Sequence, residues 1–77
     1  MLDLLEQFID ERCIESKMAL PFAAFVTAFN RWSRSSISRD EVFFLMQGQD
    51  RLAMHAEGRR VSVFCVIPEE QKDMVGG

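Results

Sequence analysis

Residues 20–67 of the chain read LPFAAFVTAFNRWSRSSISRDEVFFLMQGQDRLAMHAEGRRVSVFCVI. In this stretch an aromatic run with helical spacing is followed by a polar loop, a second helical run, and two strand-like runs on either side of a glycine. The order predicts two helices followed by a hairpin. The segments before and after this stretch supply the remaining helix, a short strand and the C-terminal tail.

The aromatic run after Pro21 predicts a core helix. Proline suits the first turn of a helix because its missing N–H group would have no partner there in any case. The apolar residues that follow recur at helical spacing and include Trp32: Phe22, Phe25, Val26, Phe29 and Trp32. Such a stripe is also compatible with a base-stacking surface, but stacking aromatics usually lie on open sheets among basic residues. We therefore expect the stripe to form the centre of the hydrophobic core.

The segment Ile37–Val42 predicts the start of a further helix. Ser38 is a typical N-cap, and Glu41 three residues later completes a capping box, while Ile37 and Val42 supply a hydrophobic staple. The helix is expected to run from Arg39 to about Gln47. Its inward face is expected to carry Val42, Leu45 and Met46, and its outer face Arg39, Asp40, Phe43 and Gln47.

The remaining segments complete the expected fold. Apolar spacing predicts a first helix over residues 2–13 and a short strand over residues 18–20. Two further strands are expected over residues 52–56 and 61–67, with Gly58 in the turn between them and Arg59 and Arg60 at the tip. The sequence after residue 67 is polar and acidic, and we expect a flexible C-terminal tail over residues 68–77.

This order of elements predicts an α+β fold of the winged helix-turn-helix type over residues 1–67. Three helices would pack on a small antiparallel sheet made of the hairpin, or wing, and the short strand. A winged helix presents one helix and one hairpin on the same side, where they meet a DNA groove and the adjacent backbone. The candidate DNA-binding residues on this basis are Arg34, Arg39, Phe43, Gln47, Arg59 and Arg60.

Composition limits the classes of protein that this chain can belong to. With 77 residues, 48% of them hydrophobic, it is expected to form one domain that buries roughly 60% of its unfolded surface. The two cysteines, Cys13 and Cys65, have no second Cys or His at metal-ligand spacing, so we expect buried thiols in a reducing cytoplasm and no metal or cofactor. No apolar run approaches the ~20 residues of a membrane span, and the acidic N-terminus is unlike a signal peptide.

The distribution of charge is more informative than the net charge of −3. Residues 1–17 contain five acidic and two basic side chains, and residues 69–77 three acidic and one basic. Residues 31–60 contain six arginines against four carboxylates. The basic excess therefore falls on the segment where a winged helix meets DNA, although it amounts to only two charges.

Each candidate residue also has an interpretation that involves no ligand. Arg59 and Arg60 either hold phosphates or are solvated residues that protect the edge of a hairpin. Phe43 either contacts a partner or is buried by a modest rotation of its helix. His55, the only histidine, has no partner at catalytic or metal-binding spacing, so we expect neither an enzyme nor a small-molecule substrate.

The sequence resembles the C-terminal winged-helix domain of the primase-helicases encoded by phages and plasmids. The resemblance covers residues 8–67 and rests on four segments: FIDERC, FAAFVTAFNRW, the Ser-initiated SRDEVFFLM, and EGRRVSVFCVI. Family members carry primase and helicase modules upstream, whereas this sequence begins with the winged helix and has no nucleotide-binding glycine loop. The resemblance implies a stand-alone winged-helix protein rather than a primase or an ATPase.

Two functions of different class remain open. The first is a small DNA-binding protein that contacts duplex DNA weakly, as an accessory replication factor or a regulator of a mobile element. The second is a winged-helix protein–protein interaction module without nucleic-acid binding, whose partners would be replication or regulatory proteins. A continuous basic face over residues 39–47 and the hairpin tip would favour DNA, whereas an acidic or apolar face would favour protein.

Overall fold

The computed structural model describes residues 2–68, which form three helices and one sheet. The elements in chain order are α1 (Leu2–Arg12), β1 (Ile14–Pro21), α2 (Phe22–Ser33), α3 (Arg39–Met46), β2 (Met54–Glu57) and β3 (Arg60–Val66). The strands are antiparallel in the order β1-β3-β2. The expected α+β class, with three helices and a small antiparallel sheet, is confirmed. The prediction of a flexible tail falls almost entirely on residues 69–77, outside the described residues.

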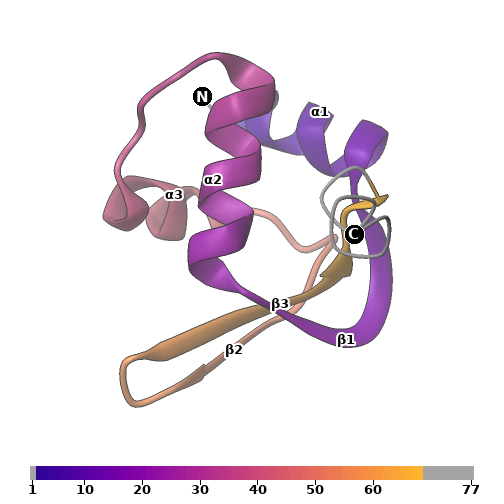
Figure 1. The fold of residues 1–77 in the computed structure, drawn as a ribbon, viewed down its shortest axis with the longest axis vertical. Coiled ribbons are helices and arrows are strands. Elements are labelled where there is room, and N and C mark those ends of the chain that lie inside the picture. Colours follow the sequence, from indigo (N-terminus) through magenta and orange to yellow (C-terminus); the bar gives the residue numbers. More distant parts are fainter. Residues whose placement is uncertain (1, 69–77) are drawn as a thin grey trace, which may run out of the picture.

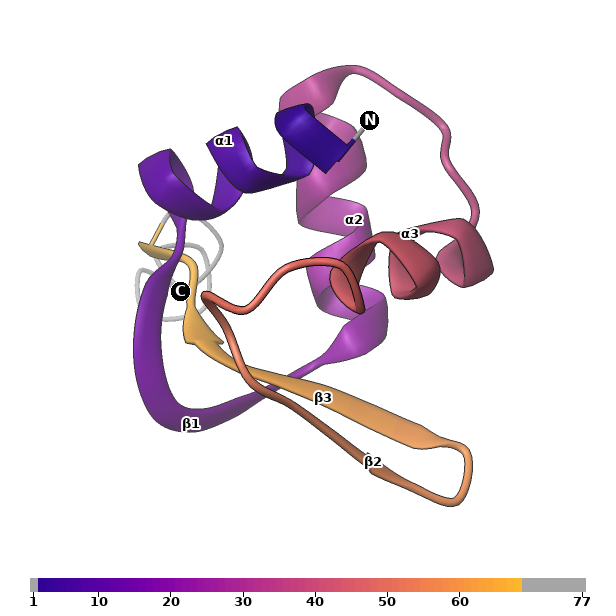
Figure 2. The same cartoon turned by 180° about the vertical axis from the view of Figure 1, so that it is seen from behind.

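The helices lie together on one side of the sheet, and the β2–β3 hairpin extends beyond them beneath α3 (Figures 1 and 2). Gly58 has a φ of 62° in the two-residue turn between Glu57 and Arg60, which face each other in the ladder. A left-handed residue at this first turn position suits the twist of a tight hairpin, and glycine adopts it without strain. The predicted role of Gly58 is therefore confirmed.

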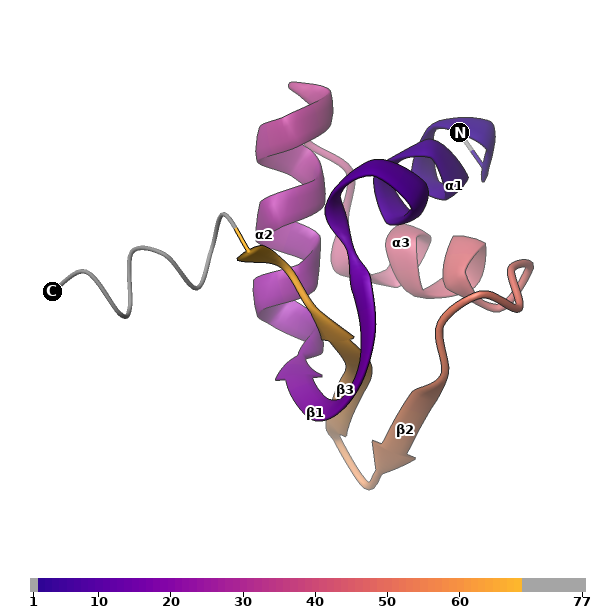
Figure 3. The ribbon, with the colours of Figure 1, turned by 90° about the vertical axis from the view of Figure 1, so that its right-hand side faces the viewer.

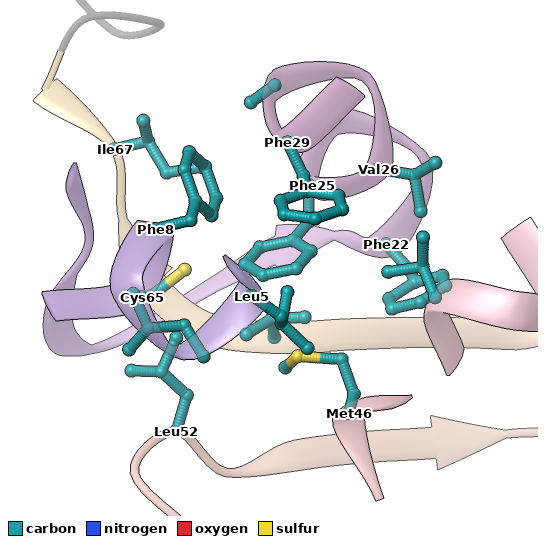
Figure 4. Packing of buried hydrophobic residues seen from close by; sticks show 14 residues of the cluster. Leu5, Phe8, Phe22, Phe25, Val26, Phe29, Met46, Leu52, Cys65 and Ile67 are labelled. Carbon is teal, nitrogen blue, oxygen red and sulfur yellow. The ribbon is translucent and has the colours of Figure 1, made fainter. Parts of the chain in front are cut away.

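The core lies between the helices and the central strand β3 (Figure 4). The predicted stripe of α2 is buried at Phe22, Phe25, Val26 and Phe29, but Trp32 at the end of the helix is only half-buried. Phe8 of α1 is 1% exposed and packs its ring against Phe25, Phe29 and Trp32, with centroids 5.6, 5.5 and 5.3 Å away. Phe8 is therefore the aromatic side chain that joins α1 to α2.

Strand β1 is longer than predicted. Only residues 18–20 were expected to be extended, whereas the strand begins at Ile14, one residue after α1, and runs to Pro21 (Figure 3). Pro21 was expected in the first turn of α2, but its ψ of 137° is extended and it is the N-cap of the helix. Glu15 faces Cys65 and Ala19 faces Phe64, so the residues between them bulge out of the ladder. The Met18 N–H group donates to Ser16 Oγ within this bulge at 3.1 Å. The bulge breaks the alternation of apolar side chains, which is why the sequence pattern hid the first half of the strand.

Helix α3 begins where its capping signal predicts. The Ser38 side chain accepts a hydrogen bond from the Glu41 N–H group at 3.2 Å, and Arg39 is the first helical residue. The helix ends at Met46, with Gln47 as its C-cap rather than its last residue. The predicted start is confirmed, and the predicted end differs by one residue.

The loop before β2 explains why this strand starts later than predicted. Gln49 Nε2 donates to the Leu52 carbonyl at 2.9 Å, and Gln49 Oε1 accepts from the Leu52 N–H group at 3.0 Å. Because both backbone groups of Leu52 are taken by one side chain, they are not available for a ladder, and β2 begins at Met54. The side chain of Leu52 extends from this loop into the core, where it is buried.

The loop is also attached to α1, because Arg51 forms an ion pair with Asp10 of that helix.

Asn30 fixes the approach of the chain to α3, a role that the sequence pattern did not reveal. Its Nδ2 donates to the Ile37 carbonyl at 2.9 Å, and its Oδ1 accepts from the Ile37 N–H group at 3.0 Å. The Asn30 carbonyl also accepts from the N–H groups of Arg34 and Ser35 at the end of α2. One residue of α2 thereby closes the loop between the two helices.

We expect Asn30→Ala to lower the free energy of unfolding by about 1 to 3 kcal/mol, because it leaves both backbone groups of Ile37 without their partner in a half-buried loop. Urea denaturation followed by circular dichroism measures the change. Thr27→Ala is a suitable control, since exposed Thr27 only bonds back to the Ala23 carbonyl of its own helix. Equal losses in the two variants would show that the Asn30 contacts contribute nothing specific.

Candidate nucleic-acid interface

Three of the predicted site residues converge at the tip of the hairpin. Arg39 is the first residue of α3, Arg59 lies in the hairpin turn, and Arg60 is the first residue of β3. Arg39 Nη2 donates to the Arg59 carbonyl at 3.5 Å, so the start of α3 and the turn are in direct contact. All three residues are exposed, and no ion pair of the described residues involves them. The three positive charges therefore face solvent together.

Two clefts lie around these arginines. The larger, of about 470 Å³, lies between the hairpin and the first turn of α2 and is lined by Pro21, Phe22, Ala23, Arg39, Arg59, Arg60, Val61 and Ser62. The smaller, of about 300 Å³, lies between the hairpin and α3 and is lined by Arg39, Asp40, Phe43, Gly58, Arg59 and Val61. Apolar residues and arginines line both clefts, and Asp40 also lines the smaller one. The larger is lined by three arginines and by no acidic residue.

Arg39 is held over the larger cleft by packing as well as by its hydrogen bond. Its guanidinium carbon lies 5.8 Å from the centroid of the Phe22 ring, which is itself 1% exposed. A guanidinium group over an aromatic face is stabilised by the ring quadrupole. Arg39 is thus positioned by α2, by α3 and by the hairpin, although its side chain remains accessible.

The outer face of α3 differs from the prediction. Phe43 was placed there with burial as the alternative, and the alternative is the one observed: Phe43 is half-buried and its ring meets the Phe22 ring edge-on, with centroids 5.8 Å apart. Phe44 is the exposed aromatic, at 73% of its surface. Val42 and Met46 lie one turn apart and both are buried, so they mark the side of α3 that faces the core. Phe44 lies two residues from each of them, and its side chain therefore points about 180° away from that side. The spacing of Val42 and Met46 was the signal in the sequence that identifies Phe44.

The same geometry gives α3 an acidic rather than a basic outer face. Asp40 and Glu41 are exposed one turn before Phe44, and neither forms an ion pair among the described residues. Leu45, predicted to point inward, is half-buried. The basic surface is therefore confined to the beginning of α3 and the hairpin, and it does not continue along the helix.

Two other candidate residues lie away from this surface. Arg34 is exposed at the C-terminal end of α2, about 18 Å from the first turn that lines the larger cleft. Its φ of 56° makes it the left-handed C-cap of α2, a structural role. Gln47 is exposed at the end of α3, about 12 Å along the helix from Arg39. Neither residue joins the arginine cluster.

Comparisons with known proteins do not assign this site. No protein-family model, curated protein or solved structure matches the chain. The resemblance to primase-helicase winged-helix domains consequently stays a hypothesis, and the function must be argued from the arginines and their surroundings.

The two cysteines, which were expected to be buried thiols, lie close together. Cys13 follows α1 and is half-buried, whereas Cys65 is buried in β3, and pairing of Ile14 with Val66 brings them close. A hydrogen bond between the two thiols is the main cause that raises the pKa of Cys13, and burial raises it further. The same hydrogen bond lowers the pKa of Cys65. Their contact depends on the β1–β3 register, which a sequence pattern does not reveal.

Residues 2–68 contain neither a cluster of metal ligands nor a helix that could span a membrane. No group of three or more His, Cys, Asp or Glu side chains there could hold a metal ion. None of the helices in this range has the length and apolar character needed to cross a membrane. His55 on β2 is exposed, with its Nε2 atom 3.7 Å from a carboxylate oxygen of Glu57 on the same strand.

Proposed function

We propose that this chain is a winged-helix protein that binds duplex DNA through its backbone phosphates, as an accessory replication factor or a regulator of a mobile element. The observation that carries the proposal is the convergence of Arg39, Arg59 and Arg60 on the larger cleft, between the hairpin and the first turn of α2. Arginine forms bidentate hydrogen bonds with phosphate oxygens, and it does so best where no carboxylate competes. The role in replication or regulation rests on the resemblance to primase-helicase domains.

The arrangement of elements supports a winged helix. The β2–β3 hairpin follows α3, and β1, which lies between α1 and α2 in the chain, pairs with β3. The tip of the hairpin lies on the same side of the domain as α3 (Figure 2). In winged-helix proteins this side meets DNA, with a helix in the major groove and the hairpin along the backbone. Arg59 and Arg60 would then lie on phosphates, and Arg39 at the junction of helix and wing.

The number of arginines sets the strength of this binding. Three phosphate contacts predict a slope of about −2.7 for the logarithm of affinity against the logarithm of salt concentration, or a loss of about 40-fold between 50 and 200 mM salt. Because α3 carries Asp40 and Glu41 on its outer face, it adds no further phosphate contacts. We therefore expect weak binding with little dependence on DNA sequence.

Fluorescence anisotropy with labelled duplexes of different sequence tests the proposal. We expect binding at low salt with similar affinity for each duplex and the slope given above. Absence of binding to single- and double-stranded DNA at tens of micromolar protein would contradict it. A slope near zero would also contradict it, because contacts with phosphate release counterions.

A winged-helix protein-interaction module without nucleic-acid binding is the second candidate. One specific observation favours it: the position that reads DNA in a winged helix is occupied here by exposed Phe44, with Asp40 and Glu41 one turn away. Carboxylates oppose the approach of phosphate, whereas an exposed aromatic ring on a helix is typical of a protein contact. The anisotropy experiment separates the two candidates directly.

A further inference from the structure

The outer face of α3 combines an exposed aromatic side chain with two exposed carboxylates. Phe44 is 73% exposed, more than any other large hydrophobic residue in the described part of the chain. Asp40 and Glu41 beside it are also exposed and form no ion pair there. We name this surface, formed by Asp40, Glu41 and Phe44, the acidic–aromatic face. It is complementary to a partner surface that has an apolar recess with basic groups around it.

The structure contains a surface of this kind next to the acidic–aromatic face. The cleft of about 300 Å³ between α3 and the hairpin is lined by the apolar residues Phe43 and Val61 and by two arginines, Arg39 and Arg59, against one carboxylate, Asp40. A phenyl ring placed in it would be buried against apolar atoms, and carboxylates beside the ring would face guanidinium groups. The charge and the apolar character of the two surfaces are therefore complementary.

We infer that a second copy of this chain docks on α3, with Phe44 of each copy in the cleft of the other. Both surfaces include α3, so one two-fold axis can satisfy both contacts at once, as the isologous interface of a homodimer requires. Glu41 of one copy would then face Arg59 of the partner subunit. This goes beyond the proposed DNA binding and does not depend on it.

The dimensions of α3 agree with this arrangement. The helix is about 12 Å long, so two antiparallel copies crossing near their midpoints bring the end of one helix opposite the start of the other. Phe44 thereby comes opposite the cleft beside Arg39 and Asp40. Because the contact comprises one short helix and a hairpin tip, the interface is small and the dimer is expected to be weak.

Analytical ultracentrifugation of the whole chain at protein concentrations up to about 1 mM tests this inference. We expect a monomer–dimer equilibrium that weakens as salt is raised, and Phe44→Ala should weaken it at least about tenfold, as for a central aromatic contact. Met18→Ala is the matched control, since Met18 is 60% exposed but lies on β1. It should leave the equilibrium unchanged.

A pair of charge reversals tests the partner surface. Glu41→Arg and Arg59→Glu should each weaken the dimer, and the double variant should restore it, because the two charges are exchanged across the same contact. A wild-type chain that is monomeric at about 1 mM would overturn the inference, as would equal effects of Phe44→Ala and Met18→Ala. Since these measurements contain no DNA, their failure leaves the proposed function standing, and loss of DNA binding leaves the dimer standing.

Discussion

Phe8→Ala is expected to lower the free energy of unfolding by about 3 to 5 kcal/mol, the largest effect on stability that we expect from a single substitution in this chain. Phe8 is 1% exposed, and its ring joins α1 to three aromatic rings of α2. Removing it leaves a cavity between elements that cannot collapse onto each other. A chain of this length has roughly 4 to 12 kcal/mol of stability in total, so the variant should be close to unfolding.

Phe44→Ala is the matched control, because it removes the same atoms from a position that is 73% exposed. At low micromolar concentration, where the proposed dimer is dissociated, it should change the free energy of unfolding by no more than about 0.5 kcal/mol. Urea denaturation of both variants, followed by far-ultraviolet circular dichroism, measures the difference. Similar midpoints for the two variants would contradict the core described above.

Replacing Arg39, Arg59 and Arg60 together by Gln should lower the affinity for duplex DNA by about 100-fold or more at 0.1 M salt. The three side chains line one cleft, and no other arginine lies on its wall. The substitutions remove the phosphate contacts but keep polar side chains of similar length at exposed positions. The salt slope should fall toward zero, and the loss should be the same for every DNA sequence.

Arg34→Gln is the control for this variant, since it removes the same charge from the far end of α2. It should leave the affinity within about twofold of the wild type, apart from the general effect of net charge. Anisotropy at several salt concentrations measures both variants. If Arg34→Gln weakened binding as much as Arg59→Gln alone, the binding surface would not be the cleft at the hairpin tip.

Local chemistry in the sequence was sufficient to predict the order and most limits of the elements. Ser38 caps the start of α3 and Gly58 forms the hairpin turn, because each has a backbone preference that acts over a few residues. Pro21 indicated the beginning of α2 to within one residue, since it is the N-cap and not part of the first turn. The buried side of α2 followed from its apolar spacing in the same way. Trp32 was the exception, since its burial depends on what covers the end of α2.

The candidate site was predicted only in part. The sequence placed Arg39, Arg59 and Arg60 on the same side of the predicted fold, but it did not reveal that they are in contact. The hydrogen bond from Arg39 to the Arg59 carbonyl and the packing of Arg39 over Phe22 depend on contacts between three elements. The same list of candidates included Arg34, which the length of α2 places at the opposite end of the helix.

What the sequence determined by itself was therefore the set of helices, the hairpin and the core side of α2, because caps, turns and periodicity act between near neighbours. Only the tertiary structure decided the length of β1 and the contact between Cys13 and Cys65. Each of these depends on the register of β1 against β3, which joins segments far apart in the sequence. The rotation of α3 is an intermediate case, because the spacing of Val42 and Met46 indicates it and the contact of Phe43 with Phe22 agrees with that angle.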